Sequence, residues 1–126
     1  MVEPSPSGAR SQRRILVVED EAMVAMLLED MLADIGLETI GPVGRLSEAV
    51  DAARTGAFEA AILDVNLAGQ ETYPVADVLI ERGIPFVFAT GYGVGGLRDA
   101  YRDRPVLQKP FQQSDLEDRI TALGLS

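Results

Sequence analysis

The sequence contains neither cysteine nor histidine among its 126 residues. Without cysteine the chain can form no disulfide framework and no thiolate metal site, and without histidine it has no imidazole ligand or general base. Zinc centres, cysteine nucleophiles and serine–histidine catalytic systems are therefore excluded. Carboxylates, hydroxyls and amines remain as the side-chain groups that could carry chemistry.

Long apolar runs and an excess of positive charge are missing as well. No apolar stretch approaches the roughly 18 residues that a membrane span requires. Residues 1–13 are rich in proline, serine, glycine and arginine and lack the apolar block of a signal peptide. Eleven basic residues against 20 acidic ones give a formal net charge of −9, which disfavours broad electrostatic binding to nucleic acid or anionic lipid. We predict a cytoplasmic protein without a nucleic-acid or membrane partner.

The length and composition predict one folded domain at residues 14–126, preceded by a disordered extension at residues 1–13. Five segments have the apolar, β-branched character of strands: 15–18, 37–43, 60–63, 84–89 and 106–108. Each is followed by a segment with helical character: 21–35, 46–54, 74–83, 97–102 and 114–123. This order predicts an α/β fold, a doubly wound five-stranded parallel sheet flanked by five helices. The fourth helix should be short or frayed, because glycines crowd residues 91–96 and each costs a helix about 1 kcal/mol relative to alanine.

Polar side chains follow the predicted strands at the sheet edge where ligands bind in such folds. They are Glu19 and Asp20 after the first strand, Asp64 after the third, Thr90 after the fourth and Lys109 after the fifth. Crowded carboxylates repel one another unless a cation joins them, and Mg²⁺ is typically held by carboxylates together with a phosphoryl oxygen. A hydroxyl and an ammonium can bind the other phosphoryl oxygens. Each residue alone would be explained as a helix cap, a turn residue or a surface charge, but their shared edge predicts a site for phosphate on a carboxylate.

Four motifs stand in order along the chain: LVVEDE at 16–21, AILDVNL at 61–67, FATG at 88–91 and QKPF at 108–111. Together they resemble the receiver domain of bacterial two-component response regulators, over about residues 14–124. The resemblance implies a flavodoxin-like, CheY-like fold. It also implies that Asp64 is the nucleophile that takes a phosphoryl group from a phosphohistidine on a sensor histidine kinase or a histidine phosphotransfer protein. Thr90 would hydrogen-bond one phosphoryl oxygen and Lys109 would pair with another.

The same resemblance implies a magnesium site. The side chains of Asp20 and Asp64 and the backbone carbonyl of Asn66 would bind Mg²⁺, and Glu19 would act through a bound water. Such a protein is not an enzyme that turns over an external substrate, since it is itself the substrate of the transfer. We expect a monomer in the unphosphorylated state and signalling through an unidentified downstream protein.

One position departs from the common receiver pattern, and one run of residues resembles a particular subgroup of receivers. Val106 stands three residues before Lys109, where receivers usually carry a tyrosine or phenylalanine that changes position during activation. The run PFVFATGY at 85–92 resembles the single-domain receivers called FAT GUY regulators. We therefore expect phosphorylation to order the segment 91–102 in place of an aromatic flip.

Two other functions are compatible with parts of the sequence. Gly91, Gly93 and Gly96 satisfy the G-x-G-x-x-G pattern of dinucleotide-binding proteins, after a predicted strand and before a helix. The pattern lies in the fourth strand–helix unit instead of the first, which argues against it. The chain could also be a receiver-like interaction module that is never phosphorylated, although the presence of every expected acidic, hydroxyl and lysine position disfavours this.

Overall fold

A computed structural model describes residues 13–91, 97–101 and 103–124. Five parallel strands form its main sheet: β1 (Arg14–Val18), β2 (Glu38–Val43), β3 (Ala60–Asp64), β6 (Phe86–Thr90) and β7 (Val106–Gln108). Their order across the sheet is β2-β1-β3-β6-β7. Strands β1, β3 and β6 are almost wholly buried, as their continuous apolar runs predicted.

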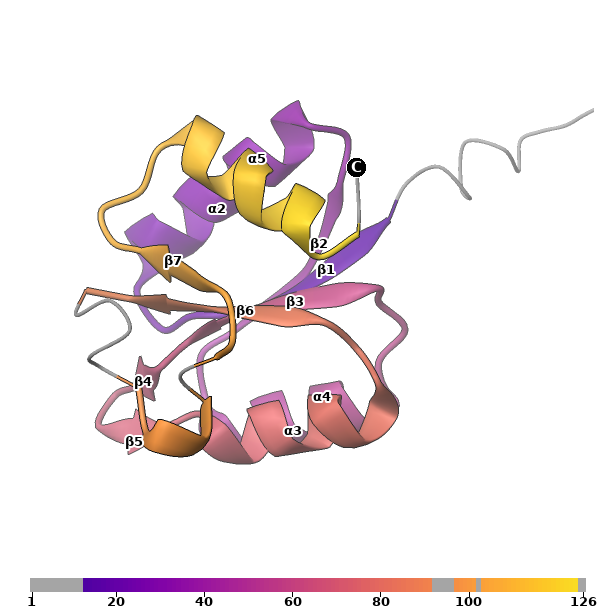
Figure 1. The fold of residues 1–126 in the computed structure, drawn as a ribbon, viewed down its shortest axis with the longest axis vertical. Coiled ribbons are helices and arrows are strands. Elements are labelled where there is room, and N and C mark those ends of the chain that lie inside the picture. Colours follow the sequence, from indigo (N-terminus) through magenta and orange to yellow (C-terminus); the bar gives the residue numbers. More distant parts are fainter. Residues whose placement is uncertain (1–12, 92–96, 102, 125–126) are drawn as a thin grey trace, which may run out of the picture.

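Helices cover both faces of this sheet (Figure 1). Helices α2 (Ala22–Asp34) and α5 (Gln113–Ala122) lie on one face, and α3 (Leu46–Thr55) and α4 (Tyr73–Arg82) lie on the other. Two apolar clusters fill the layers between sheet and helices. The predicted doubly wound α/β fold is therefore confirmed. No described helix is long and apolar enough to cross a membrane.

The region of the predicted fourth helix differs from a full α-helix. Within the described residues of 97–102, the chain forms only a 3₁₀ turn, η2 (Asp99–Tyr101), so four α-helices rather than five are described. The expectation of a short helix is consistent with this result. Residues 92–96 and 102 lie outside the described part of the chain, as do residues 1–12 of the predicted extension.

The loop between β3 and α4 contains a hairpin that the sequence did not predict. Strands β4 (Asn66–Leu67) and β5 (Gln70–Glu71) pair antiparallel. The two residues between them, Ala68 and Gly69, have φ angles of 48° and 91°, the signs that a two-residue hairpin turn requires. The short strands lack the β-branched residues by which strands are recognised, which is why the pattern suggested only a loop.

The start of α5 differs from what its sequence suggests, because Ser114 and Glu117 have the spacing of a capping box. The helix begins one residue earlier, at Gln113, and the N–H of Gln112 donates to Asp115 Oδ2 at 2.8 Å. The acidic residue that caps this helix is therefore two positions before the one expected.

Candidate functional site

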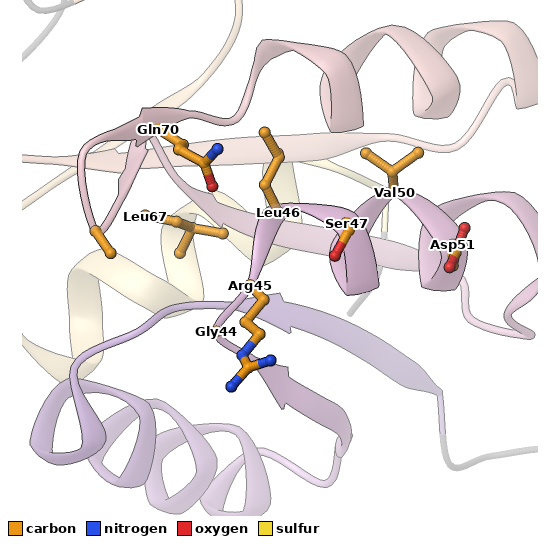
Figure 2. A pocket seen from close by; sticks show the side chains of 9 residues that line it. Gly44, Arg45, Leu46, Ser47, Val50, Asp51, Leu67 and Gln70 are labelled. Carbon is orange, nitrogen blue, oxygen red and sulfur yellow. The ribbon is translucent and has the colours of Figure 1, made fainter.

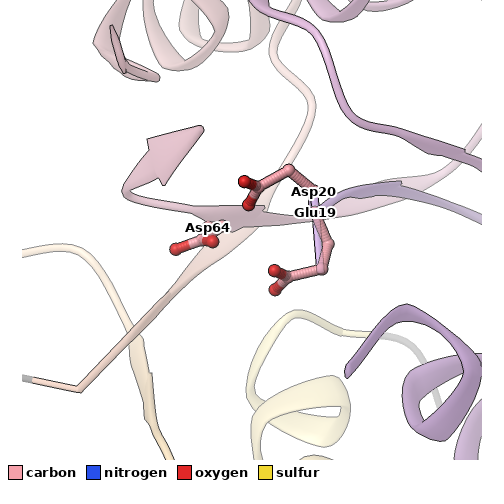
Figure 3. Close-up of side chains that lie close together, drawn as sticks. All are labelled: Glu19, Asp20 and Asp64. Atoms are coloured by element: carbon pink, nitrogen blue, oxygen red, sulfur yellow. The ribbon is translucent and has the colours of Figure 1, made fainter. Parts of the chain in front are cut away.

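Three carboxylates meet at the carboxyl ends of β1 and β3. Glu19 and Asp20 follow β1, and Asp64 ends β3. One carboxylate oxygen from each residue lies within 4.8 Å of those of the other two (Figure 3). Glu19 and Asp64 are buried, whereas Asp20 is exposed. The cluster arises because β1 and β3 are adjacent parallel strands in register, so that the residues after each strand end at the same edge.

Lys109 supplies a positive charge to this cluster from the loop after β7. Its Nζ lies 3.1 Å from Glu19 Oε1 and 3.4 Å from Asp64 Oδ2. Its backbone N–H donates to the Thr90 carbonyl at 2.8 Å, which fixes the loop against β6. Burial opposes the charge on Lys109, but the carboxylates of Asp64 and Glu19 outweigh burial and raise its pKa above its ordinary value.

Glu19 shows how strongly the acids are crowded. Burial, reinforced by the negative charge of Asp64, raises the pKa of Glu19 from 4.5 to about 7. The N–H of Glu21 and the ammonium of Lys109 oppose this rise only in part. Lys109 therefore does not fully offset the burial of Glu19 and the charge of Asp64. A divalent cation with a preference for oxygen ligands fits the donor set of the three carboxylates.

Thr90 and Asn66, the other predicted site residues, lie at the same edge. Thr90 is the last residue of β6, the strand next to β3, and its side chain is buried. Asn66 lies two residues after Asp64, and its N–H approaches Asp64 Oδ1 at 3.4 Å. Its side-chain oxygen accepts the N–H of Gly69 at 2.8 Å, so the side chain braces the hairpin turn. Neither contact involves the backbone carbonyl of Asn66, which is the group predicted to bind Mg²⁺.

The β4–β5 hairpin adds two contacts that sequence reasoning missed. At its tip, the N–H of Ala68 donates to Asp20 Oδ2 at 3.2 Å. At its base, the hydroxyl of Thr72 donates to the backbone carbonyl of Asp64 at 2.6 Å. A threonine directly before Tyr73-Pro74 would be interpreted from sequence as a helix N-cap, and a backbone N–H leaves no trace in the residue pattern.

An open pocket of about 570 Å³ lies beside the acids, between the β2–α3 loop and the hairpin (Figure 2). Ala68, whose N–H donates to Asp20, lines the pocket, and Gly44 on its wall lies close to the Asp20 backbone. The pocket contains both apolar and polar residues: Gly44, Arg45, Leu46, Ser47, Val50, Asp51, Leu67, Ala68 and Gln70. The acidic edge, where charged groups converge, is the better candidate site.

The described part of the structure gives no support for the alternative of a dinucleotide-binding site. Gly91 follows β6, but Gly93 and Gly96 lie outside the described residues. The next described element is the 3₁₀ turn Asp99–Tyr101, not a helix whose N-terminus could hold a pyrophosphate.

Comparison with known proteins gives several relatives, although no protein-family model matches the chain. The transcriptional regulatory protein PdtaR of Mycobacterium tuberculosis is 34% identical over 114 residues, covering 87% of this chain and 56% of PdtaR. The chain spans about half the length of the curated relatives it matches.

Solved structures of receiver proteins superpose closely. SdrG from Sphingomonas melonis Fr1 is 44% identical, with a TM-score of 0.81 over 90% of this chain and 97% of SdrG. The BeF3-activated conformation of SdrG from Pseudomonas melonis Fr1 is 46% identical in sequence, with a TM-score of 0.75 over 87% of this chain and 94% of that chain. The receiver domain of the sensor histidine kinase PA1611 from Pseudomonas aeruginosa PAO1 has the same fold, at 23% identity and a TM-score of 0.78 over 89% of this chain and 97% of that chain. In that structure a magnesium ion is coordinated in the active-site cleft.

Proposed function

Since this chain belongs to the response regulator receiver family, we propose that it accepts a phosphoryl group on Asp64 from a phosphohistidine donor. The observation that carries the proposal is the position of the Asp64 carboxylate. It lies at the edge of the sheet within 3.4 Å of Lys109 Nζ and beside two further acids. A sensor histidine kinase or a histidine phosphotransfer protein would be the donor.

In this mechanism an Asp64 carboxylate oxygen attacks phosphorus while the bond to the donor imidazole nitrogen breaks. The electron pair of that bond returns to the imidazole, and an acyl phosphate forms on Asp64. Lys109 Nζ, now 3.4 Å from Asp64 Oδ2, would pair with a phosphoryl oxygen. The Thr90 hydroxyl, at the end of the adjacent strand, would donate to another.

Asp20, Asp64 and the Asn66 carbonyl are the groups that would hold Mg²⁺, with Glu19 acting through water. The metal ion would offset the charge of the phosphoryl oxygens during transfer. Burial and, after it, the charge of Asp64 raise the pKa of Glu19, and the contribution of Asp64 supports this assignment because Lys109 offsets it only in part. Asp20, the exposed acid, is accessible from solvent, so a hydrated ion can reach it.

The donor would dock on the exposed apolar face of α2. Met23, Met26 and Leu27 on this helix are 84%, 62% and 45% exposed. Next to them, Val24, Leu27, Pro110 and Phe111 line an apolar pocket of about 270 Å³ that has Lys109 in its wall. A donor side chain seated in this pocket would bring its phosphohistidine close to Lys109 and Asp64. Exposed apolar surface of this kind is typical of protein interaction sites.

Output would pass through the segment after β6. Its described part is tied to α4: the N–H of Arg98 donates to the Tyr73 hydroxyl at 3.0 Å, and the Tyr101 hydroxyl donates to Asp77 Oδ1 at 2.6 Å. The Tyr73 and Tyr101 rings stack with centroids 4.5 Å apart. Phosphorylation would order the segment 91–102, of which residues 92–96 and 102 lie outside the described part of the chain, and so alter the surface that a downstream protein binds.

The test is incubation with acetyl phosphate and Mg²⁺, followed by intact-mass measurement. We expect the wild-type chain to gain one phosphoryl group, and Asp64→Asn or wild type with a chelator to gain none. Absence of any mass gain from acetyl phosphate and from the histidine kinases of the cell would instead support an interaction module that is never phosphorylated.

A further inference from the structure

Thr72 connects the end of the phosphoacceptor strand to the helix that follows. Its side chain is fully buried, and its Oγ1 donates to the Asp64 carbonyl at 2.6 Å while lying 3.3 Å from the Val65 carbonyl oxygen. Its backbone N–H donates to the same Val65 carbonyl at 2.9 Å. These bonds close the base of the β4–β5 hairpin, so that one residue joins both ends of the loop.

The use of this hydroxyl is unusual for a residue in its position. Thr72 is the N-cap of α4, and its carbonyl accepts the N–H groups of Val75 and Ala76 as an N-cap carbonyl should. A threonine N-cap ordinarily accepts a first-turn N–H with its side-chain oxygen, yet Thr72 makes no such bond. Its hydroxyl is a donor toward the end of β3 instead, which indicates a role at the strand end and not in starting the helix.

The hydrogen bonds of Thr72 hold the backbone of Asp64 and the base of the hairpin, and phosphoryl transfer would depend on the position of both. The Asp64 side chain is short, so a shift of its backbone passes almost undiminished to the carboxylate. The hairpin above Thr72 places the N–H of Asn66 near Asp64 Oδ1 and the N–H of Ala68 on Asp20 Oδ2. Loosening the base of the hairpin would therefore disturb two of the three acids together.

We propose that Thr72 is a positioning residue for phosphoryl transfer, whose hydroxyl holds the Asp64 backbone so that the carboxylate faces the donor. The proposal rests on the function proposed above. The Thr72 hydroxyl contacts the backbone carbonyls of Asp64 and Val65, so its effect on the reaction would be exerted through the backbone of Asp64.

The test compares the phosphorylation rates of folded variants with acetyl phosphate and Mg²⁺. Thr72→Val keeps the branched shape without the hydroxyl, and Thr72→Ser keeps the hydroxyl. Thr55→Val is the matched control, because the Thr55 hydroxyl also donates to a backbone carbonyl, that of Asp51 at 3.0 Å, at the distant end of α3. Circular dichroism at the assay temperature establishes that each variant is folded.

We expect Thr72→Val to be slowed about tenfold, since small displacements of a reacting group cost rate steeply, and Thr72→Ser and Thr55→Val to stay within about threefold of wild type. A folded Thr72→Val that reacts at the wild-type rate, or a Thr55→Val slowed equally, would overturn the proposal. If Thr72→Val does not fold, Thr72→Ala against Thr72→Ser makes the same comparison, because that pair differs by the hydroxyl alone. A wild-type chain that gains no phosphoryl group would refute the proposed function itself, and this inference with it.

Discussion

Replacing Glu19 with glutamine should stabilise the metal-free protein at pH 8 and change its stability much less at pH 5. Glu19 is buried beside Asp64, and its pKa is raised from 4.5 to about 7 in the folded chain. Between these two values the folded state keeps the proton that the unfolded state has released, so the stability of wild type falls as the pH rises from about 4.5 to about 7. Glutamine has no proton to lose, and the variant escapes this loss.

The magnitude follows from the width of that interval. About 2.5 pKa units between 4.5 and about 7, at about 1.36 kcal/mol per unit, give a difference on the order of 3 kcal/mol at pH 8. Urea unfolding of both chains at pH 5, 6, 7 and 8, with a chelator present, measures the difference directly. Added Mg²⁺ should then stabilise wild type at pH 8 through binding to the folded state. A gap between the two chains that does not change with pH, or a wild type more stable than Glu19→Gln at pH 8, would refute the assignment of Glu19 as a crowded, poorly compensated acid.

Four further substitutions distinguish the residues of the site from residues outside it. Asp20→Ala should abolish Mg²⁺-dependent phosphorylation, whereas Glu21→Ala, which removes an N-cap side chain that makes no capping bond, should cost only about 0.5 kcal/mol in urea unfolding and leave the reaction intact. The hydrogen bond to Asp77 raises the pKa of Tyr101 to about 12. In an ultraviolet titration of the tyrosines, Tyr101→Phe should therefore lack the step near pH 12 that the wild-type chain shows. Arg82→Met should lower stability by about 1–2 kcal/mol without slowing phosphorylation, since the Arg82 guanidinium donates to the Ala53 and Gly56 carbonyls far from the acids. Equal phosphorylation by Asp20→Ala and wild type, an unchanged titration in Tyr101→Phe, or a slowed reaction in Arg82→Met would each contradict the role assigned to that residue.

The sheet and its acidic edge could be predicted because they depend on long-range rules that leave a local pattern. The apolar run before Glu19 marks a strand buried on both faces, and parallel packing then brings the residues after β1 and β3 together. The same rules placed Thr90 and Lys109 at that edge. The parallel sheet and the shared edge of the carboxylates therefore followed from residue types, whereas the order of the strands did not.

The hairpin and its contacts could not be predicted in this way. Ala68 donates its backbone N–H to Asp20, a contact that any residue type except proline could make. Thr72 has the sequence context of an ordinary N-cap, and only the three-dimensional position of Asp64 shows that its hydroxyl points elsewhere. Contacts made by the backbone, or by a side chain with two equally reasonable partners, require the structure.

Every role proposed for the acidic edge depends on Asp64 carrying the phosphoryl group, and mapping the modified residue decides whether it does. After phosphorylation with acetyl phosphate and Mg²⁺, borohydride reduction converts an aspartyl phosphate to homoserine, which peptide mass spectrometry locates in the sequence. We expect homoserine at position 64 and at no other acid. Reduction at Asp20 or Glu19, or a phosphoryl group that survives Asp64→Asn, would show that another residue is the acceptor.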